Sequence, residues 1–344
     1  MVVRRETSRF GVLGALLLLA AACGSSKSSD EPLRPAPIDA NEGGAPAAVE
    51  PTAGMTNESS GASDGEVDEP GAPDPLNPIG EPCNGRDTYC GLPYDQICFA
   101  ATHDSAANSP TYWEVPVQDR TILEQLRDGI RALSLSLFDE QGTPTVCRVS
   151  CEQGNTALAV VLADVAQFLD ENPREVVSLL IDGDVPAANI AAEFAAKGLD
   201  ERSLVQSPDD DWPTLGAMID AGTRLVVFAK TPDEGPAWLL PRQTFLWETA
   251  RDWSSLAAMS CNPAVGTRAQ PLYVVHQNLV TAGEDDAAPN AELAAQANAL
   301  DVVAARLEKC RDQYSHAPNF VAVDFSSEGA VLDATLAING DQAR

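Results

Sequence analysis

The feature that most constrains the fold is an alternation of apolar runs with helix-like stretches along residues 81–344. Six runs rich in Val, Leu, Ile and Phe show little polar alternation, as strands covered on both faces do; they are 96–101, 131–138, 175–181, 224–229, 272–276 and 319–325. Helix-like stretches lie at 119–128, 156–171, 187–197, 214–220, 291–311 and 329–338. This order predicts a single α/β domain with a helix-covered parallel sheet, long enough for a closed barrel of the TIM type. An open doubly wound sheet is the alternative, although no glycine-rich turn of the dinucleotide-binding kind follows a strand.

Residues 1–22 have the pattern of a secretory signal peptide, with three arginines before an apolar run from Phe10 to Ala22. The run is too short to remain as a membrane-spanning helix. Cys23 directly follows three alanines, as in bacterial lipoprotein signals, so we expect it to carry the lipid that anchors an exported protein to a bacterial cell envelope, at the outer membrane or cell surface. A plain signal peptide with an incidental cysteine is the alternative.

Residues 23–80 are expected to form a disordered tether. They contain nine prolines, no aromatic residue, and 11 acidic residues against two basic ones. So few large apolar groups cannot offset the entropy of ordering the chain, and like charges extend it. The rest of the chain, 81–344, has 39 acidic and 17 basic residues, a net charge of −22. Such a surface repels polyanions at long range, which excludes nucleic acid as a partner.

The seven cysteines after Cys23 favour disulfides, because the protein is expected to be exported. Two pairs are close enough in sequence to close loops, Cys83 with Cys90 and Cys147 with Cys151, and Cys261 with Cys310 makes a longer bridge. Cys98 lies within an apolar run, where we expect a buried free thiol. A catalytic Cys98 is the weaker alternative, since no histidine is placed to activate it.

Polar residues follow several of the predicted strands. His103 comes after the first, Asp182 after the third and Lys230 after the fourth, while Asp324 lies near the end of the last. Because active sites of TIM-type barrels lie at the carboxyl ends of the strands, we expect these side chains to converge on one mouth.

Seven segments together resemble a known family; they lie at 101–105 (Ala-Thr-His-Asp-Ser), 125–133, 168–177, 212–216, 224–228, 246–249 and 318–325. Their order resembles the X domain of phosphatidylinositol-specific phospholipase C, in its secreted bacterial and fungal branch. The resemblance implies a distorted TIM barrel that cleaves a phosphodiester beside a sugar hydroxyl. One histidine takes the proton of the inositol 2-hydroxyl, a second protonates the departing diacylglycerol oxygen, and an arginine or calcium offsets the phosphate charge.

The family's catalytic positions are only partly retained. The resemblance makes His103 the general base, Asp104 its neighbour, Asp182 the strand-end carboxylate and Asp324 the partner of the base. Carboxylates in these places orient and tune the imidazole.

Three positions depart from the family. Ser134 and Ser136 stand where it has acidic residues, or an acidic residue and an arginine, and Arg148 stands where it has the second histidine. Two remaining carboxylates provide poorly for calcium, so no metal cofactor is expected. Arg148 stays protonated and cannot act as a general acid. It either clamps a phosphate through two hydrogen bonds or forms a salt bridge to Asp104 or Asp182 in a decayed site.

Two further residues are candidates for substrate binding. Lys230 ends the fourth strand, and His276 ends a later strand where the family often has an Asn-His pair. His276 either lines the rim of the mouth or is structural, whereas His316 lies in a loop and is expected to be solvated.

The sequence therefore supports two functions. The first is a lipid-anchored phosphoric diester hydrolase of the phosphatidylinositol phospholipase C type, acting on an inositol phospholipid or another phosphodiester with reduced or altered activity. The second is a non-catalytic surface lipoprotein that uses the same pocket to bind a sugar phosphate or a protein partner. Arg148 is the residue that separates them.

Overall fold

The computed structural model describes residues 81–231, 233–281 and 289–342, so the expected signal peptide, Cys23 and the tether lie outside the described residues. One sheet runs through this part of the chain, in the order β7-β6-β5-β2-β1-β11-β10-β8-β9. Its parallel strands are β1 (Phe99–Thr102), β2 (Ala132–Glu140), β5 (Val177–Gly183), β6 (Leu225–Ala229), β7 (Leu239–Pro241), β8 (Leu246–Thr249), β10 (Leu272–His276) and β11 (Phe320–Val323). Antiparallel strands β3 (Thr143–Cys147) and β4 (Asn155–Ala157) extend from β2, and β9 (Pro263–Val265) pairs with β8.

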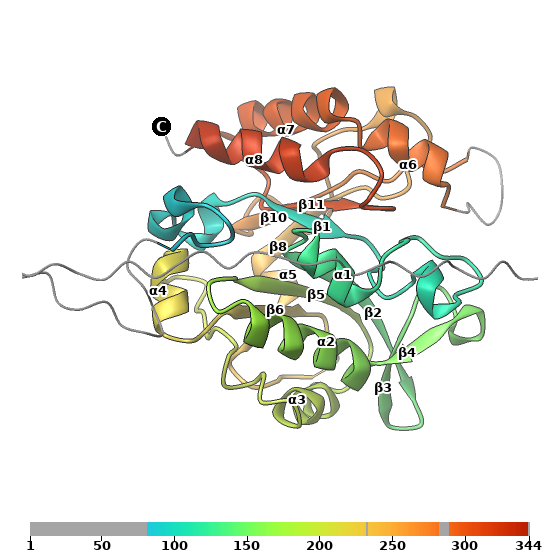
Figure 1. Cartoon of the computed structure of the whole chain (residues 1–344), viewed down its shortest axis with the longest axis vertical. Helices are drawn as coiled ribbons and strands as arrows, with labels where there is room; N and C mark the ends of the chain where they lie inside the picture. The colour runs from blue at the N-terminus through green and yellow to red at the C-terminus, as the bar shows by residue number, and fades with distance from the viewer. Residues whose placement is uncertain (1–80, 232, 282–288, 343–344) are drawn as a thin grey trace, which may run out of the picture. The chain divides into compact units, whose positions relative to one another are not determined.

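The sheet curls until its first and last parallel strands meet. Phe99 of β1 pairs with Phe320 of β11, and Thr102 pairs with Val323 (Figure 1). Among the described strands, no ladder joins β7, at one end of this order, to β8 or β9 at the other. The predicted distorted TIM-type barrel is thus confirmed, and it is open between these two ends.

Alternation along the strands separates two cores. On β1, Phe99 and Ala101 face a cluster inside the barrel, whereas Ala100 faces the cluster beneath the helices. The interior is dominated by aromatic and aliphatic groups such as Phe228 and Phe320. This packing fills the lower barrel, where Ser178 pairs with the hydroxyl of Tyr94, and the charged side chains gather toward the carboxyl ends of the strands.

Most of the helices cover the outer face of the sheet. The helices are α1 (Ile122–Arg127), α2 (Leu158–Glu171), α3 (Ala187–Ala195), α4 (Leu215–Asp220), α5 (Arg242–Phe245), α6 (Ala291–Ala297), α7 (Leu300–Tyr314) and α8 (Val331–Gln342). Of these, α4 and α5 pack instead against the interior cluster. In the view of Figure 1, α6, α7 and α8 lie on one side of the strands, and α2 and α3 lie on the other. None of the helices in the described ranges has the length and apolar character needed to cross a bilayer.

The expectation of one continuous helix over 291–311 is wrong. The chain breaks at Asn298 because that residue serves the loop after β11 instead. Its side-chain amide donates to the carbonyl of Asp324 at 2.9 Å, and its own carbonyl accepts from the backbone of Ala330 at 2.8 Å. Those bonds satisfy Asn298 outside a helical ladder.

The three expected disulfides are present, linking Cys83 to Cys90, Cys147 to Cys151 and Cys261 to Cys310. Cys98 is a buried free thiol, as expected. Burial raises its pKa far above the ordinary range, so the thiol is not a poised nucleophile.

Candidate active site

Polar side chains replace apolar ones where the inward-facing positions of the strands reach the mouth of the barrel. The alternation that turns Ala101 inward on β1 turns His103 inward two residues later, and Ala322 on β11 is followed in the same way by Asp324. His103 and Asp324 are both buried. The strand-end residues predicted to converge therefore do share one end of the barrel.

His103 lies between two carboxylates. Its Nδ1 is 2.9 Å from Oδ1 of Asp324, and its Nε2 is 3.5 Å from Oδ2 of Asp104. Asp104 adopts a left-handed conformation with φ of 41°, which is uncommon for a residue with a side chain and typical of functional loops. Burial alone would lower the pKa of His103, but Asp104 and Asp324 outweigh it and raise the pKa to about 9.

Arg148 approaches the same carboxylate from a hairpin. Strands β2 and β3 are joined through Gln141 and Gly142, both with positive φ, as a tight two-residue hairpin requires. Arg148 follows β3 within the loop closed by the Cys147–Cys151 disulfide. Its Nε lies 3.4 Å from Oδ2 of Asp104. Of the two salt bridges considered for Arg148, the structure therefore contains the one to Asp104.

Ser136 completes this side of the site. Its hydroxyl donates to Oδ1 of Asp104 at 3.1 Å, and it lies beside Asp182 in the register of β2 and β5. Ser136, Arg148 and Asp182 line a cavity of about 400 Å³. The cavity therefore joins Arg148 to the strand-end carboxylate Asp182.

Asp182 is paired with cations on its other side. Nζ of Lys230 lies 3.7 Å from its Oδ1, and Nη2 of Arg251 lies 3.9 Å from its Oδ2. Both contacts are long, and the Lys230 side chain is 60% exposed, so the lysine ion pair contributes little to stability.

Below the mouth lies a buried network centred on Glu248. One of its oxygens accepts two bonds from Arg242, at 2.9 and 2.7 Å. The other lies 2.8 Å from Nε2 of His276 and 3.1 Å from Nη2 of Arg251. Burial alone would raise the pKa of Glu248, but the two arginines and His276 hold it well below its ordinary value. We call Arg242, Glu248 and His276 the floor of the site.

His276 lies at this floor, not at the rim. Its side chain is 1% exposed, and its ring lies edge-on to that of His103 with centroids 6.2 Å apart. Burial lowers its pKa to about 4 in spite of Glu248, so the ring is neutral at neutral pH.

Three residues of the site, Arg242, Glu248 and Arg251, were not singled out from the sequence. Glu248 falls inside the quoted segment 246–249, at the end of a strand that was too short to recognise. That strand-end position was the available signal. Neither arginine carries such a signal, since α5 places Arg242 and the loop after β8 places Arg251.

Cations gather at this mouth on a strongly acidic protein. Four of the 17 basic residues of 81–344 are here, Arg148, Lys230, Arg242 and Arg251. When His103 is protonated, the site holds five positive charges against the four carboxylates of Asp104, Asp182, Glu248 and Asp324. The site is therefore suited to an anion. No group of three or more His, Cys, Asp or Glu in the described ranges is arranged for a metal, and Asp104 and Asp182 already face cations, so these carboxylates do not fit a calcium site.

Comparisons with known proteins agree with this architecture. The family described as PI-PLC X 1 matches residues 89–339. A protein of Arthroderma benhamiae named PI-PLC X domain-containing protein 1 is 30% identical, over 75% of this chain and 89% of its own. A second protein of the same fungus, named an uncharacterized secreted protein, is 31% identical over 75% of this chain, which spans only 63% of it.

One solved structure shows the same fold at low identity. It is a variant of phosphatidylinositol-specific phospholipase C from Staphylococcus aureus, with a TM-score of 0.51 and 13% identity, covering 73% of this chain and 94% of that one. At this identity the match supports the barrel architecture and carries no residue roles.

Proposed function

Because the chain belongs to the PI-PLC X family, we propose that it is a phosphoric diester hydrolase of the phosphatidylinositol phospholipase C type, with His103 as its general base. The observation that carries the proposal is the 2.9 Å contact between Nδ1 of His103 and Asp324. Asp324 holds the proton on Nδ1 and leaves Nε2 to face the reacting hydroxyl, as the carboxylate does in other catalytic pairs.

The chemistry follows from this arrangement. In the neutral form, Nε2 of His103 takes the proton of a hydroxyl neighbouring the phosphodiester. The hydroxyl oxygen bonds to phosphorus as the bond to the departing alcohol breaks, giving a cyclic phosphate. Arg148, which approaches the same oxygen of Asp104 as Nε2 of His103, offsets the phosphate charge. Water supplies the proton for the leaving oxygen, because Arg148 cannot release one.

Two kinetic properties follow. The pKa of His103 is about 9, so kcat/KM should rise about tenfold per pH unit between pH 6 and 8 and level off near pH 9. Without a general acid, the rate should also depend steeply on the leaving group. A nitrophenyl ester of inositol phosphate should react about 10²–10⁴ times faster than phosphatidylinositol. A pH-independent rate, or equal rates for the two substrates, would contradict this mechanism.

An inositol phospholipid is the proposed substrate, and the proposed location is outside the cytoplasm. Export is supported by the pattern of residues 1–22 and by the name of the secreted fungal relative. The lipid anchor at Cys23 rests on the sequence pattern alone. Labelling with a radioactive fatty acid in cells, with Cys23→Ser as control, tests it, and equal labelling of both proteins would refute it.

The direct test is turnover of phosphatidylinositol and of a soluble inositol phosphodiester by the full chain. Activity should be present, and His103→Ala should remove it, whereas Lys197→Ala, a change on the outer helical surface, should leave it intact. Activity that survives His103→Ala would exclude the proposed mechanism.

The second candidate is a non-catalytic binding protein for a sugar phosphate or a protein partner. The ion pair between Arg148 and Asp104, in the place of the second histidine, favours it. No turnover by the natural protein, together with turnover gained by Arg148→His combined with Ser136→Asp, would establish this alternative.

A further inference from the structure

Arg251 is a cation of the mouth that neither the sequence motifs nor the family positions point to. It follows β8, and its Nη2 bonds Oε2 of Glu248 at 3.1 Å while lying 3.9 Å from Asp182. Its side chain is 31% exposed, so it is neither part of the closed floor nor a surface residue. Its charge lowers the pKa of His103, and Asp104 is among the groups that raise its own pKa. Arg251 therefore lies between the floor of the site and Asp182.

The guanidinium of Arg251 carries a charge that Glu248 does not fully neutralise. Glu248 already accepts two bonds from the buried Arg242, through the oxygen that Arg251 does not use. Arg242 and Arg251 thus share Glu248, and Arg251 shares Asp182 with Lys230, so three cations meet two carboxylates and one positive charge is in surplus. Arg242 is buried, so the surplus lies with the more exposed Arg251 and Lys230.

Arg251 also reaches the side of the mouth where the resembling family has an arginine and this chain has Ser136. In the strand order, β2 and β8 are separated by β1, β11 and β10. Ser136 lies beside Asp182 in the register of β2 and β5, and Arg251, from the loop after β8, lies 3.9 Å from Asp182. Asp182 thus links Arg251 to the position of Ser136.

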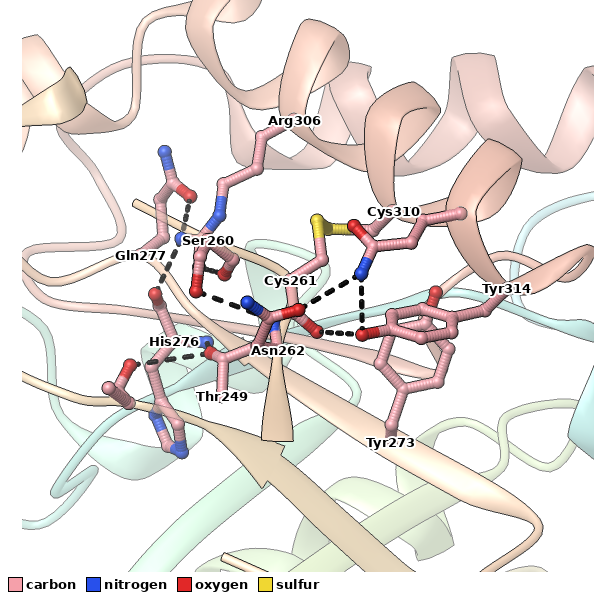
Figure 2. Close-up of a disulfide and its surroundings, with 12 residues drawn as sticks. Thr249, Ser260, Cys261, Asn262, Tyr273, His276, Gln277, Arg306, Cys310 and Tyr314 are labelled. Carbon is pink, nitrogen blue, oxygen red and sulfur yellow. Dashed lines mark hydrogen bonds between the residues drawn. A yellow bond between two sulfur atoms is a disulfide. The ribbon is translucent and has the colours of Figure 1, made fainter. Parts of the chain in front are cut away.

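The loop that carries Arg251 is held in place by a second layer of contacts, of which Figure 2 shows those around Arg306, Ser260 and the Cys261–Cys310 disulfide. Trp253 donates from its indole to the carbonyl of His276 at 3.0 Å, and Arg306 donates to the same carbonyl at 2.6 Å. Arg306 also bonds the carbonyl of Ser260, next to the Cys261–Cys310 disulfide that ties the loop to α7. A side chain on so restrained a loop is preorganised for binding.

We propose that Arg251 binds the phosphoryl group of the substrate, opposite Arg148, and supplies from the loop after β8 the cation that is missing at position 136. This inference rests on the proposed function for the identity of the anion. Because negative charge grows on the phosphoryl oxygens as the reaction proceeds, Arg251 acts mainly on kcat.

The test uses the full chain and the probe myo-inositol 1-phosphate, with myo-inositol as the uncharged reference. Arg251→Gln should weaken binding of the phosphate at least tenfold by calorimetry, lower kcat about 10²-fold, and leave binding of myo-inositol unchanged. Arg251→Lys, which retains the positive charge, should retain part of the phosphate binding and part of kcat. The matched control is Arg127→Gln, which removes the same charge from an exposed pair with Glu171 on α1 and should change neither quantity. Thermal unfolding of each variant shows that it is folded.

The outcomes separate the inference from the proposed function. If Arg251→Gln is folded and binds the phosphate as tightly as the natural protein, the inference is wrong, whether or not the protein turns over. If the natural protein binds the phosphate without turnover and Arg251→Gln loses that binding, the inference holds and the catalytic proposal fails. If the natural protein neither binds nor turns over, both fail.

Discussion

His103 and His276 are both buried and lie 6.2 Å apart inside one barrel, yet their surroundings favour opposite protonation states. His103 has a carboxylate near each ring nitrogen. His276 has one carboxylate, Glu248, which it shares with two arginines, and its Nδ1 has no partner within the described residues. A proton on His276 would therefore place an unpaired N–H in the interior. Burial disfavours the charged form of both rings, so the local charge balance decides which of the two keeps its proton.

The largest expected effect is a loss of stability when the floor of the site is changed. Glu248→Gln should lower the free energy of unfolding by about 3–5 kcal/mol, because it leaves the buried Arg242 without its carboxylate and Arg251 with only the long contact to Asp182. Urea unfolding measures this. The control is Asp170→Asn, which breaks the exposed pair with Arg202 and should cost less than about 1 kcal/mol. Equal costs for the two changes would show that the floor is not a stabilising network.

The two histidines should also shape the pH dependence of stability in opposite directions. The folded pKa of His103, about 9, lies above its ordinary value of 6.5, so its contribution is complete below pH 6.5 and is lost as the pH rises through 9. The folded pKa of His276, about 4, lies below 6.5, so stability is lost as the pH falls from 6.5 toward 4. Each of these two pH-dependent losses amounts to roughly 3 kcal/mol of the free energy of unfolding.

Unfolding in urea at pH 4.5, 6.5 and 9 measures both losses. His276→Gln should reduce the loss of stability toward pH 4.5 and leave the loss toward pH 9 unchanged, and His103→Gln should do the reverse. If either variant changes both losses equally, the two rings are not independent sites.

The smallest expected effect is on the pKa of one ring. Asp324→Asn removes the carboxylate beside Nδ1 and should lower the pKa of His103 by roughly one to two units, leaving that of His276 in place. NMR titration of the imidazole signals measures both, and the pH profile of activity should shift in the same direction. An unchanged pKa for His103 would mean that Asp324 does not hold its proton.

The mouth was more predictable from the sequence than the floor. Runs such as 131–138 have the composition of doubly covered strands, and the residues that follow such runs, including His103 and Asp182, meet by the geometry of parallel strands. The floor depends on β7 and β8, of three and four residues, too short for any periodicity to be visible. Likewise, no local pattern reports that the side chains of Asn298 and Arg251 bond groups distant in sequence.

The joining of β1 to β11 has a consequence for how the protein matures. Asp324 and His103, which share the 2.9 Å contact, are separated by 221 residues, and each follows one of the two strands that close the sheet. Contacts so distant in sequence form late, after the cost of bringing the chain ends together has been met. The general base thus gains its partner only when nearly the whole chain has been synthesised. A chain truncated before Asp324 lacks the assembled pair, so the proposed phosphodiester chemistry requires the complete fold.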